Sequence, residues 1–118
     1  MVSNPSNAWL DAVPGAVMVC DKDGVVLEIN EAAARSHAKD GGRALIGRSL
    51  IDCHPEPARS RLVRLLETGD TNVYTIEKAG AKKLVYQAPW FSNGELGGLI
   101  EVVLGLPAEL PHFIRDAE

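Results

Sequence analysis

Residues 16–34 read AVMVCDKDGVVLEINEAAA, and this stretch decides the fold. Two apolar, β-branched runs, 16–20 and 25–29, flank the turn formers of residues 21–24, which is the pattern of a β-hairpin. Gly24 can take the positive φ that such a turn needs. Asn30 follows the second run as a helix N-cap, before Glu31 and three alanines that a helix accepts readily. The stretch therefore predicts a hairpin that leads directly into a helix.

Helical patterns lie on both sides of this stretch. Residues 6–13 place Trp9 and Val13 at helical spacing, and Pro14 with Gly15 stops the pattern. Glycines at 41, 42 and 47 break up the middle of the chain. Residues 57–68 are amphipathic, and Gly69 stands where a C-terminal cap belongs. We expect a short N-terminal helix, a broken helical stretch and one longer helix.

Three strand patterns complete the chain, at residues 72–78, 83–91 and 96–104. The last two should form an antiparallel meander across residues 92–94. In the first strand of that meander the two-residue period places Tyr86 and Trp90 on one face and Gln87 on the other. Pro89 predicts an edge position or a bulge.

This order of elements is α+β, with the helices gathered between two groups of strands. Residues 17–33 resemble the opening of PAS domains, with an apolar strand, Asp-x-x-Gly, a second strand and Asn-x-Ala-Ala. Residues 45–50, LIGRSL, resemble the Ile-Gly-Arg/Lys segment of the family, and residues 94–103 resemble its glycine-rich turn into an apolar last strand. The segment Asp52-Cys53-His54-Pro55 is similar to a Cys-His-Pro signature in a subgroup of bacterial PAS domains.

The resemblance implies the PAS fold, a five-stranded antiparallel sheet with helices on one face. We expect an N-terminal helix in residues 1–13, the PAS domain in 14–105, and a tail or linker in 106–118. Such a module would be sensory or regulatory, acting in bacterial signal transduction on an output domain or a partner signalling protein. We also expect a homodimer formed through Trp9, Leu10 and Val13.

Composition and charge narrow the function classes. The chain has 118 residues, 46% hydrophobic and 24% charged, with a net charge of −4, which suits one globular domain. No basic run could neutralise a row of phosphates, so we expect neither a nucleic-acid partner nor an anionic membrane partner. The sequence shows no signal peptide or transmembrane run, which predicts a cytoplasmic protein with Cys20 and Cys53 as free thiols.

The candidate ligand-binding residues are Cys53, His54, Tyr86 and Trp90. We expect Cys53 and His54 at the mouth of a pocket, because apolar residues precede them and prolines follow. Tyr86 and Trp90 lie on late strands, where PAS domains build one pocket wall; core packing is the simpler account of both.

The cofactor stays unknown. The haem-ligand position of the family falls at Leu62, so haem would need His54 or Cys53. The reactive-cysteine segment of flavin-binding relatives has no counterpart here, which disfavours flavin. No metal site and no catalytic residue is assigned.

Three functions remain open. The first is a sensor that binds a small molecule, and the second is a ligand-free dimerisation or interaction module. The third, an enzyme with Cys53 as nucleophile, is disfavoured because adjacent residues such as Cys53 and His54 do not share a face. The interior separates the first two, since small-molecule sites need a cavity of about 300 Å³ or more and an interaction module can be packed solid.

Overall fold

The computed structural model describes residues 8–116. The predicted hairpin is confirmed as β1 (Ala16–Asp21) and β2 (Val26–Ile29), which pair antiparallel, with Gly24 at a φ of 85° in the turn. Asn30 caps α2 (Glu31–Ser36), because its side chain accepts a hydrogen bond from the Ala33 amide. The stretch that decides the fold therefore forms the elements expected of it.

The remaining helices are short except for one. The described part of the N-terminal helix is α1 (Ala8–Ala12), and residues 1–7 of that prediction lie outside the described residues. Two 3₁₀ helices, η2 (Ala38–Asp40) and η3 (Gly42–Leu45), and α3 (Leu50–Cys53) form the broken middle. The longer helix is α4 (Ala58–Thr68), which ends at Gly69 with a φ of 70°, as the sequence predicted.

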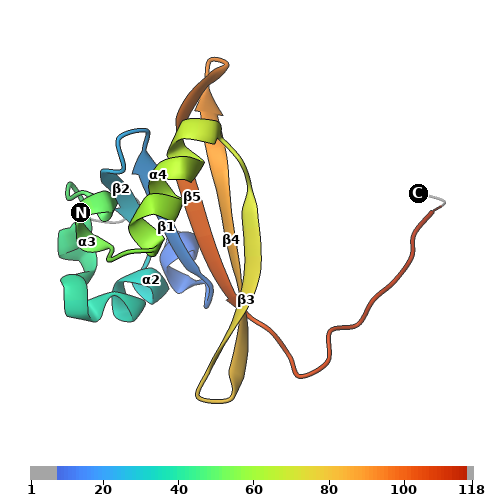
Figure 1. Cartoon of the computed structure of the whole chain (residues 1–118). Helices are drawn as coiled ribbons and strands as arrows, with labels where there is room; N and C mark the ends of the chain where they lie inside the picture. The colour runs from blue at the N-terminus through green and yellow to red at the C-terminus, as the bar shows by residue number, and fades with distance from the viewer. Residues whose placement is uncertain (1–7, 117–118) are drawn as a thin grey trace.

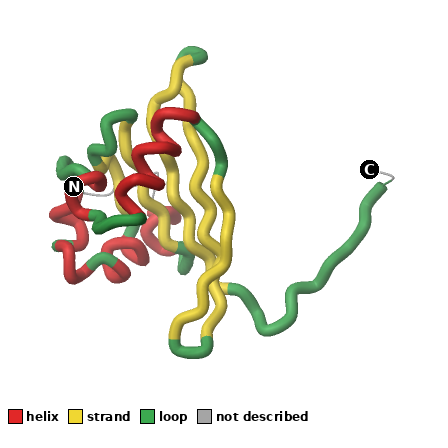
Figure 2. The backbone as a smooth tube through the Cα atoms, in the orientation of Figure 1, coloured by secondary structure: helices red, strands yellow, loops and turns green. Residues whose placement is uncertain are grey.

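The second half of the chain supplies β3 (Asn72–Lys78), β4 (Ala81–Ser92) and β5 (Glu95–Gly105). All five strands form one sheet in the order β2-β1-β5-β4-β3, and every neighbouring pair is antiparallel. Figure 1 shows α2, α3 and α4 on one side of this sheet, and Figure 2 shows the long β3–β4 and β4–β5 hairpins extending beyond them. This is the predicted five-stranded antiparallel sheet with helices on one face.

Pro89 occupies an inner strand, which its residue type makes unusual. The pairing of β3 with β4 ends at Asn72, the first residue of β3, which pairs with Gln87, so Pro89 lies beyond this end of β3 and pairs with Leu99 of β5 alone. A β-bulge follows between Trp90 and Phe91. The expectation of an edge position or a bulge is met by this local edge.

The core lies between the sheet and its helices. Its least exposed apolar side chains are Cys20, Val26 and Leu45, each about 1% exposed. Beyond β5, residues 106–116 form no helix or strand and lead away from the sheet (Figure 1). None of the helices within residues 8–116 is long and apolar enough to span a membrane.

Candidate functional site

A cavity of about 100 Å³ lies between the inner face of the sheet and helices α3 and α4. Its apolar wall combines β1, β5 and both helices, through Met18, Leu50, Ala58, Leu62 and Leu99. An apolar cavity of about 150 Å³ holds a benzene molecule, so this one has room for a very small ligand or a few waters. The interior is therefore neither packed solid nor as open as a typical small-molecule site.

The same cavity has an unusually polar second wall. Its polar side chains come from four strands, from α4 and from the C-cap of α3, and they are Cys20, His54, Arg61, Tyr74, Gln87 and Glu101. Small-molecule sites owe their specificity to a few polar groups in an apolar surround. This wall supplies such groups with both signs of charge.

Three of the polar side chains on this side of the sheet form a row across it. Asn72 of β3 pairs with Gln87 of β4, and Gln87 pairs with Glu101 of β5. Asn72 Nδ2 donates to Gln87 Oε1 at 3.0 Å, and Gln87 Nε2 donates to Glu101 Oε2 at 2.7 Å. A bond to a carboxylate is stronger than one between neutral groups. The polar row, Asn72–Gln87–Glu101, therefore holds the Glu101 carboxylate in a defined position in the wall.

His54 faces this row from the helical side. It is the C-cap of α3, and its Nδ1 lies 2.7 Å from the Leu50 carbonyl oxygen. A carbonyl oxygen can only accept, so Nδ1 carries a proton and donates it. In the neutral imidazole this leaves Nε2 with a lone pair as a hydrogen-bond acceptor.

Burial shapes the acid chemistry of two further wall residues. Burial raises the pKa of the Cys20 thiol, and the charges of Asp21 and Glu101 raise it further, against a hydrogen bond with the Leu99 backbone that lowers it. Burial also raises the pKa of Tyr74, Glu101 raises it further, and Arg61 lowers it. Because both pKa values are raised, both groups stay protonated and neutral at physiological pH. A protonated thiol is a poor nucleophile, so Cys20 acts as a hydrogen-bonding group.

Of the four residues predicted to bind ligand, only His54 lines the cavity. Cys53, at the end of α3, is half-buried and packs against the core. Tyr86 is 40% exposed and lies on the opposite face of the sheet from Gln87. Trp90 donates from Nε1 to the Cys20 carbonyl at 3.0 Å, and its ring lies against Gly97.

On β4 the cavity lies on the face of Gln87, and Tyr86 lies on the other face. Sequence reasoning missed this face because both faces of the strand carry apolar residues, so alternation alone does not say which one meets the helices. One signal was available: Glu101 is a lone acidic residue within the apolar run of residues 96–104, where burying a charge needs a reason.

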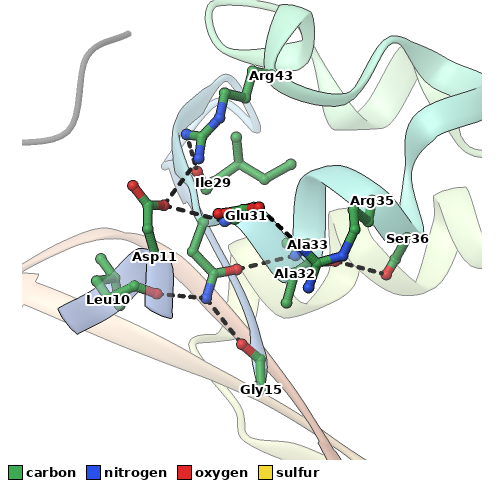
Figure 3. Close-up of polar contacts among 11 residues, drawn as sticks. Leu10, Asp11, Gly15, Ile29, Glu31, Ala32, Ala33, Arg35, Ser36 and Arg43 are labelled. Atoms are coloured by element: carbon green, nitrogen blue, oxygen red, sulfur yellow. Dashed lines mark hydrogen bonds and ion pairs between the residues drawn. The ribbon is translucent and has the colours of Figure 1, made fainter. Parts of the chain in front are cut away.

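A second polar network ties the N-terminal helix to the domain. The Asn30 side chain donates to the carbonyls of Leu10 and Gly15, both at 2.9 Å, and accepts from the amides of Val17 and Ala33. Figure 3 shows the partners Leu10, Gly15 and Ala33 converging from different segments.

Asp11 of α1 adds two further contacts in this corner. It pairs with Arg43 at 3.0 Å and accepts from the Glu31 amide (Figure 3). Helix α1 is thereby fixed to β1, α2 and η3. Ile29, the residue before Asn30, pairs with Met18, which lines the cavity. This corner is therefore adjacent to the cavity wall.

Known proteins share this architecture. The model of a family described as the PAS fold matches residues 10–104. A search of curated proteins finds no match. Among solved structures, the chain resembles the PAS domain of Bordetella pertussis BvgS, with 20% identity and a TM-score of 0.62 over 86% of this chain and 84% of that one. It also resembles a sensory box sensor histidine kinase from Vibrio cholerae, with 18% identity and a TM-score of 0.63 over 86% and 90% of the two chains.

A third similar structure is the Vibrio cholerae VqmA dimer in the absence of its target DNA, which is described in connection with the DNA binding of LuxR-type receptors. The match has 17% identity and a TM-score of 0.64, and it covers 100% of this chain and 59% of that one. Another VqmA structure is bound to DPO. At such identities the likeness concerns the fold alone.

Proposed function

Since this chain belongs to the PAS fold family, we propose that it is a cytoplasmic sensory or regulatory module that binds a small ligand and passes on a conformational signal without catalysis. The observation that carries the proposal is the cavity between the sheet and helices α3 and α4, with its wall of oriented polar groups. A domain that served only to pack against partners would gain nothing from a carboxylate and an imidazole that are partly buried around one internal space, because burying polar groups costs stability.

Signal transmission follows from the position of the corner at Asn30. A ligand changes a protein's conformation only by binding one state better than another. A ligand that contacts Met18 acts on β1, and β1 pairs with β2. Strand β2 leads directly into Asn30, whose side chain holds α1. We infer that α1 is the element that reports occupancy to an output domain or a partner signalling protein.

The partner expected at α1 is a second copy of the chain. Trp9 is 66% exposed and Val13 lies beside it at the end of the helix, while Leu10 is partly buried. Among similar structures VqmA is described as a dimer. Light scattering should show a homodimer that Trp9→Ala weakens, whereas Phe113→Ala, an equally exposed aromatic in the tail, should leave it intact. A monomer at all concentrations would contradict this.

A second candidate function is a ligand-free dimerisation module. The sheet face opposite the helices exposes Val73, Tyr86 and Leu104, each 40% or more exposed, and the cavity is small. An exposed apolar patch of this kind marks an interaction surface. Tyr86→Glu would disrupt an assembly that uses this face and would leave ligand binding in the cavity unchanged.

Native mass spectrometry and an absorption spectrum of the purified chain test the sensor directly, by showing a retained metabolite, haem or flavin. Titration of any ligand found should give about fivefold weaker binding in His54→Ala, the loss of one hydrogen bond, and no change in His112→Ala of the tail. Equal affinity in both variants would remove His54 from the site.

A ligand-binding role for Cys53, Tyr86 and Trp90 stays a prediction. None of the three lines the cavity, so we expect Cys53→Ser, Tyr86→Phe and Trp90→Phe to weaken binding less than His54→Ala does. A loss in one of them as large as that of His54→Ala would show that the ligand reaches beyond the cavity described above.

A further inference from the structure

The polar row ends in a charge that has no counter-ion. Glu101 Oε2 accepts from Gln87, and within residues 8–116 no cationic side chain forms an ion pair with this carboxylate. The two hydrogen bonds also fix the orientation of the Asn72 and Gln87 side-chain amides, because each amide N–H points toward the next oxygen along the row. Glu101 therefore presents a fixed negative charge to the cavity.

A positive charge faces it from the helical layer. Arg61 lines the same cavity from α4 and, in the described part of the chain, has no carboxylate partner of its own. Both charges act on the Tyr74 hydroxyl, whose pKa Glu101 raises and Arg61 lowers. The two unpaired charges therefore lie on either side of one small space, too far apart to pair with each other.

The size of the space limits what can connect them. With about 100 Å³ against the roughly 150 Å³ of a cavity that holds the six carbons of benzene, the enclosed space takes on the order of four non-hydrogen atoms, and a slightly larger ligand must extend toward the exposed side chain of Arg61. An amine of that size would pair with Glu101 and leave Arg61 alone. A carboxylate would pair with Arg61 and bring a second negative charge close to Glu101, which is unfavourable in a partly buried site.

We propose that the cavity selects a small zwitterion of the α-amino acid class, with its ammonium group on Glu101 and its carboxylate on Arg61. The inference rests on the proposed sensory function and names the ligand class of the same site. In the tautomer that donates from Nδ1 to Leu50, His54 Nε2 can accept a further ammonium hydrogen, and Tyr74 donates to the ligand carboxylate. Such a ligand neutralises both wall charges and adds no net charge to the interior.

Four isosteric probes test the charges one at a time on the full chain. Binding of each probe is measured from the amide NMR shifts of the cavity residues. L-alanine carries both charges, alaninamide only the ammonium, isobutyrate only the carboxylate, and isobutyramide neither. Alanine should bind at least tenfold more tightly than the other three. Equal binding of alaninamide or isobutyrate would overturn the zwitterion.

Two variants assign each charge to its residue. Glu101→Gln should abolish the preference for alanine over isobutyrate, and Arg61→Gln should abolish the preference over alaninamide. Glu77→Gln, on β3 of the same sheet, and Arg64→Gln, on the same helix, are controls outside the cavity and should keep both preferences. If Glu101→Gln and Arg61→Gln both keep the two preferences, the assignment of the charges to these residues is overturned.

The outcomes also separate this inference from the proposed function. If isobutyramide shifts the cavity resonances as strongly as alanine, the cavity binds small molecules without using its charges. The proposed zwitterionic ligand class is then wrong, and the proposed sensory function remains. If none of the four probes binds while a retained metabolite of another class does, the same conclusion holds. If neither the probes nor any retained molecule occupies the cavity, both proposals fall.

Discussion

Two asparagine networks lie at opposite ends of the sheet, one beside β2 and the other on β3. Asn30 is 2% exposed, and all four of its side-chain hydrogen bonds go to backbone groups of three segments. Asn72 is partly buried, and its bond goes to another side chain, Gln87, which in turn bonds to Glu101 at the cavity. One network is closed on the backbone, and the other ends at an unpaired charge.

The difference separates a network that holds the fold from one that, under the proposed function, contacts the ligand. Backbone groups left without partners in the interior destabilise the whole domain, so a network that satisfies them cannot change without unfolding that corner. A network among side chains leaves the strand pairing intact when it rearranges. We therefore expect substitutions in the first to change stability and substitutions in the second to change binding.

The largest effect should come from Asn30→Ala. It removes the partners of four backbone groups and the cap of α2, and the unfolding free energy should fall by about 3 kcal/mol in urea denaturation. Asn72→Ala is the matched control at the other end of the sheet and should lose less than about 1 kcal/mol, because its single bond is to a side chain. Equal losses would break the comparison.

The next largest effect tests the seam between the two networks. Gly98 of β5 pairs with Asp21 of β1, and a Cβ there would overlap the Cys20 carbonyl oxygen and the Asp21 backbone. Gly98→Ala should therefore lower the unfolding free energy by about 2 kcal/mol or prevent folding.

Gly105→Ala, at the end of the same strand, is the control, because a Cβ there meets no atom of the described residues. It should stay within about 0.5 kcal/mol of wild type. A Gly98→Ala protein as stable as wild type would show that the pairing of β1 with β5 can adjust to a larger residue. The two networks would then not be separated by a rigid strand pair.

Glu101→Gln should have a smaller effect on stability. The amide keeps an acceptor for Gln87 and removes an unpaired charge from the cavity wall, so the unfolding free energy should change by less than about 1 kcal/mol. The same variant is expected to lose its preference for a zwitterion. A loss of stability as large as that of Asn30→Ala would place Glu101 among the residues that hold the fold.

The smallest effect concerns alkaline pH. The pKa of Tyr74 is raised, first by burial and then by Glu101, so the folded state keeps the proton longer than the unfolded chain. The resulting stability is present below the ordinary tyrosine pKa of about 10 and is lost as pH rises through the folded value. The wild type should therefore lose stability above that pH more steeply than Tyr74→Phe.

Tyr86→Phe, on the opposite face of the sheet, retains Tyr74 and should keep the wild-type decline. In Glu101→Gln a spectroscopic titration should show a lower pKa for Tyr74, because one of the groups that raises it is gone. An unchanged titration would mean that the Glu101 carboxylate does not face the Tyr74 hydroxyl.

Local patterns explain why the fold could be predicted and most of the site could not. Gly24, Asn30 and Gly69 act within a few residues of their own positions, where turn and cap chemistry is visible in the sequence. The polar row depends on the register of three strands, and Arg61 meets it from a helix in another layer. His54, which lines the cavity, lies in a loop that the sequence makes recognisable, whereas predicting Gln87 and Glu101 needed the choice between two apolar strand faces.

The bond from Trp90 to the Cys20 carbonyl has an optical consequence. The indole lies against the backbone of a residue whose side chain lines the cavity, and the other tryptophan, Trp9, is on α1. The chain thus contains one tryptophan beside the cavity and one on the element proposed to report occupancy. In Trp9→Phe the emission of Trp90 would follow cavity filling, and in Trp90→Phe the emission of Trp9 would follow the movement of α1, so the order of the two events could be timed in unlabelled protein.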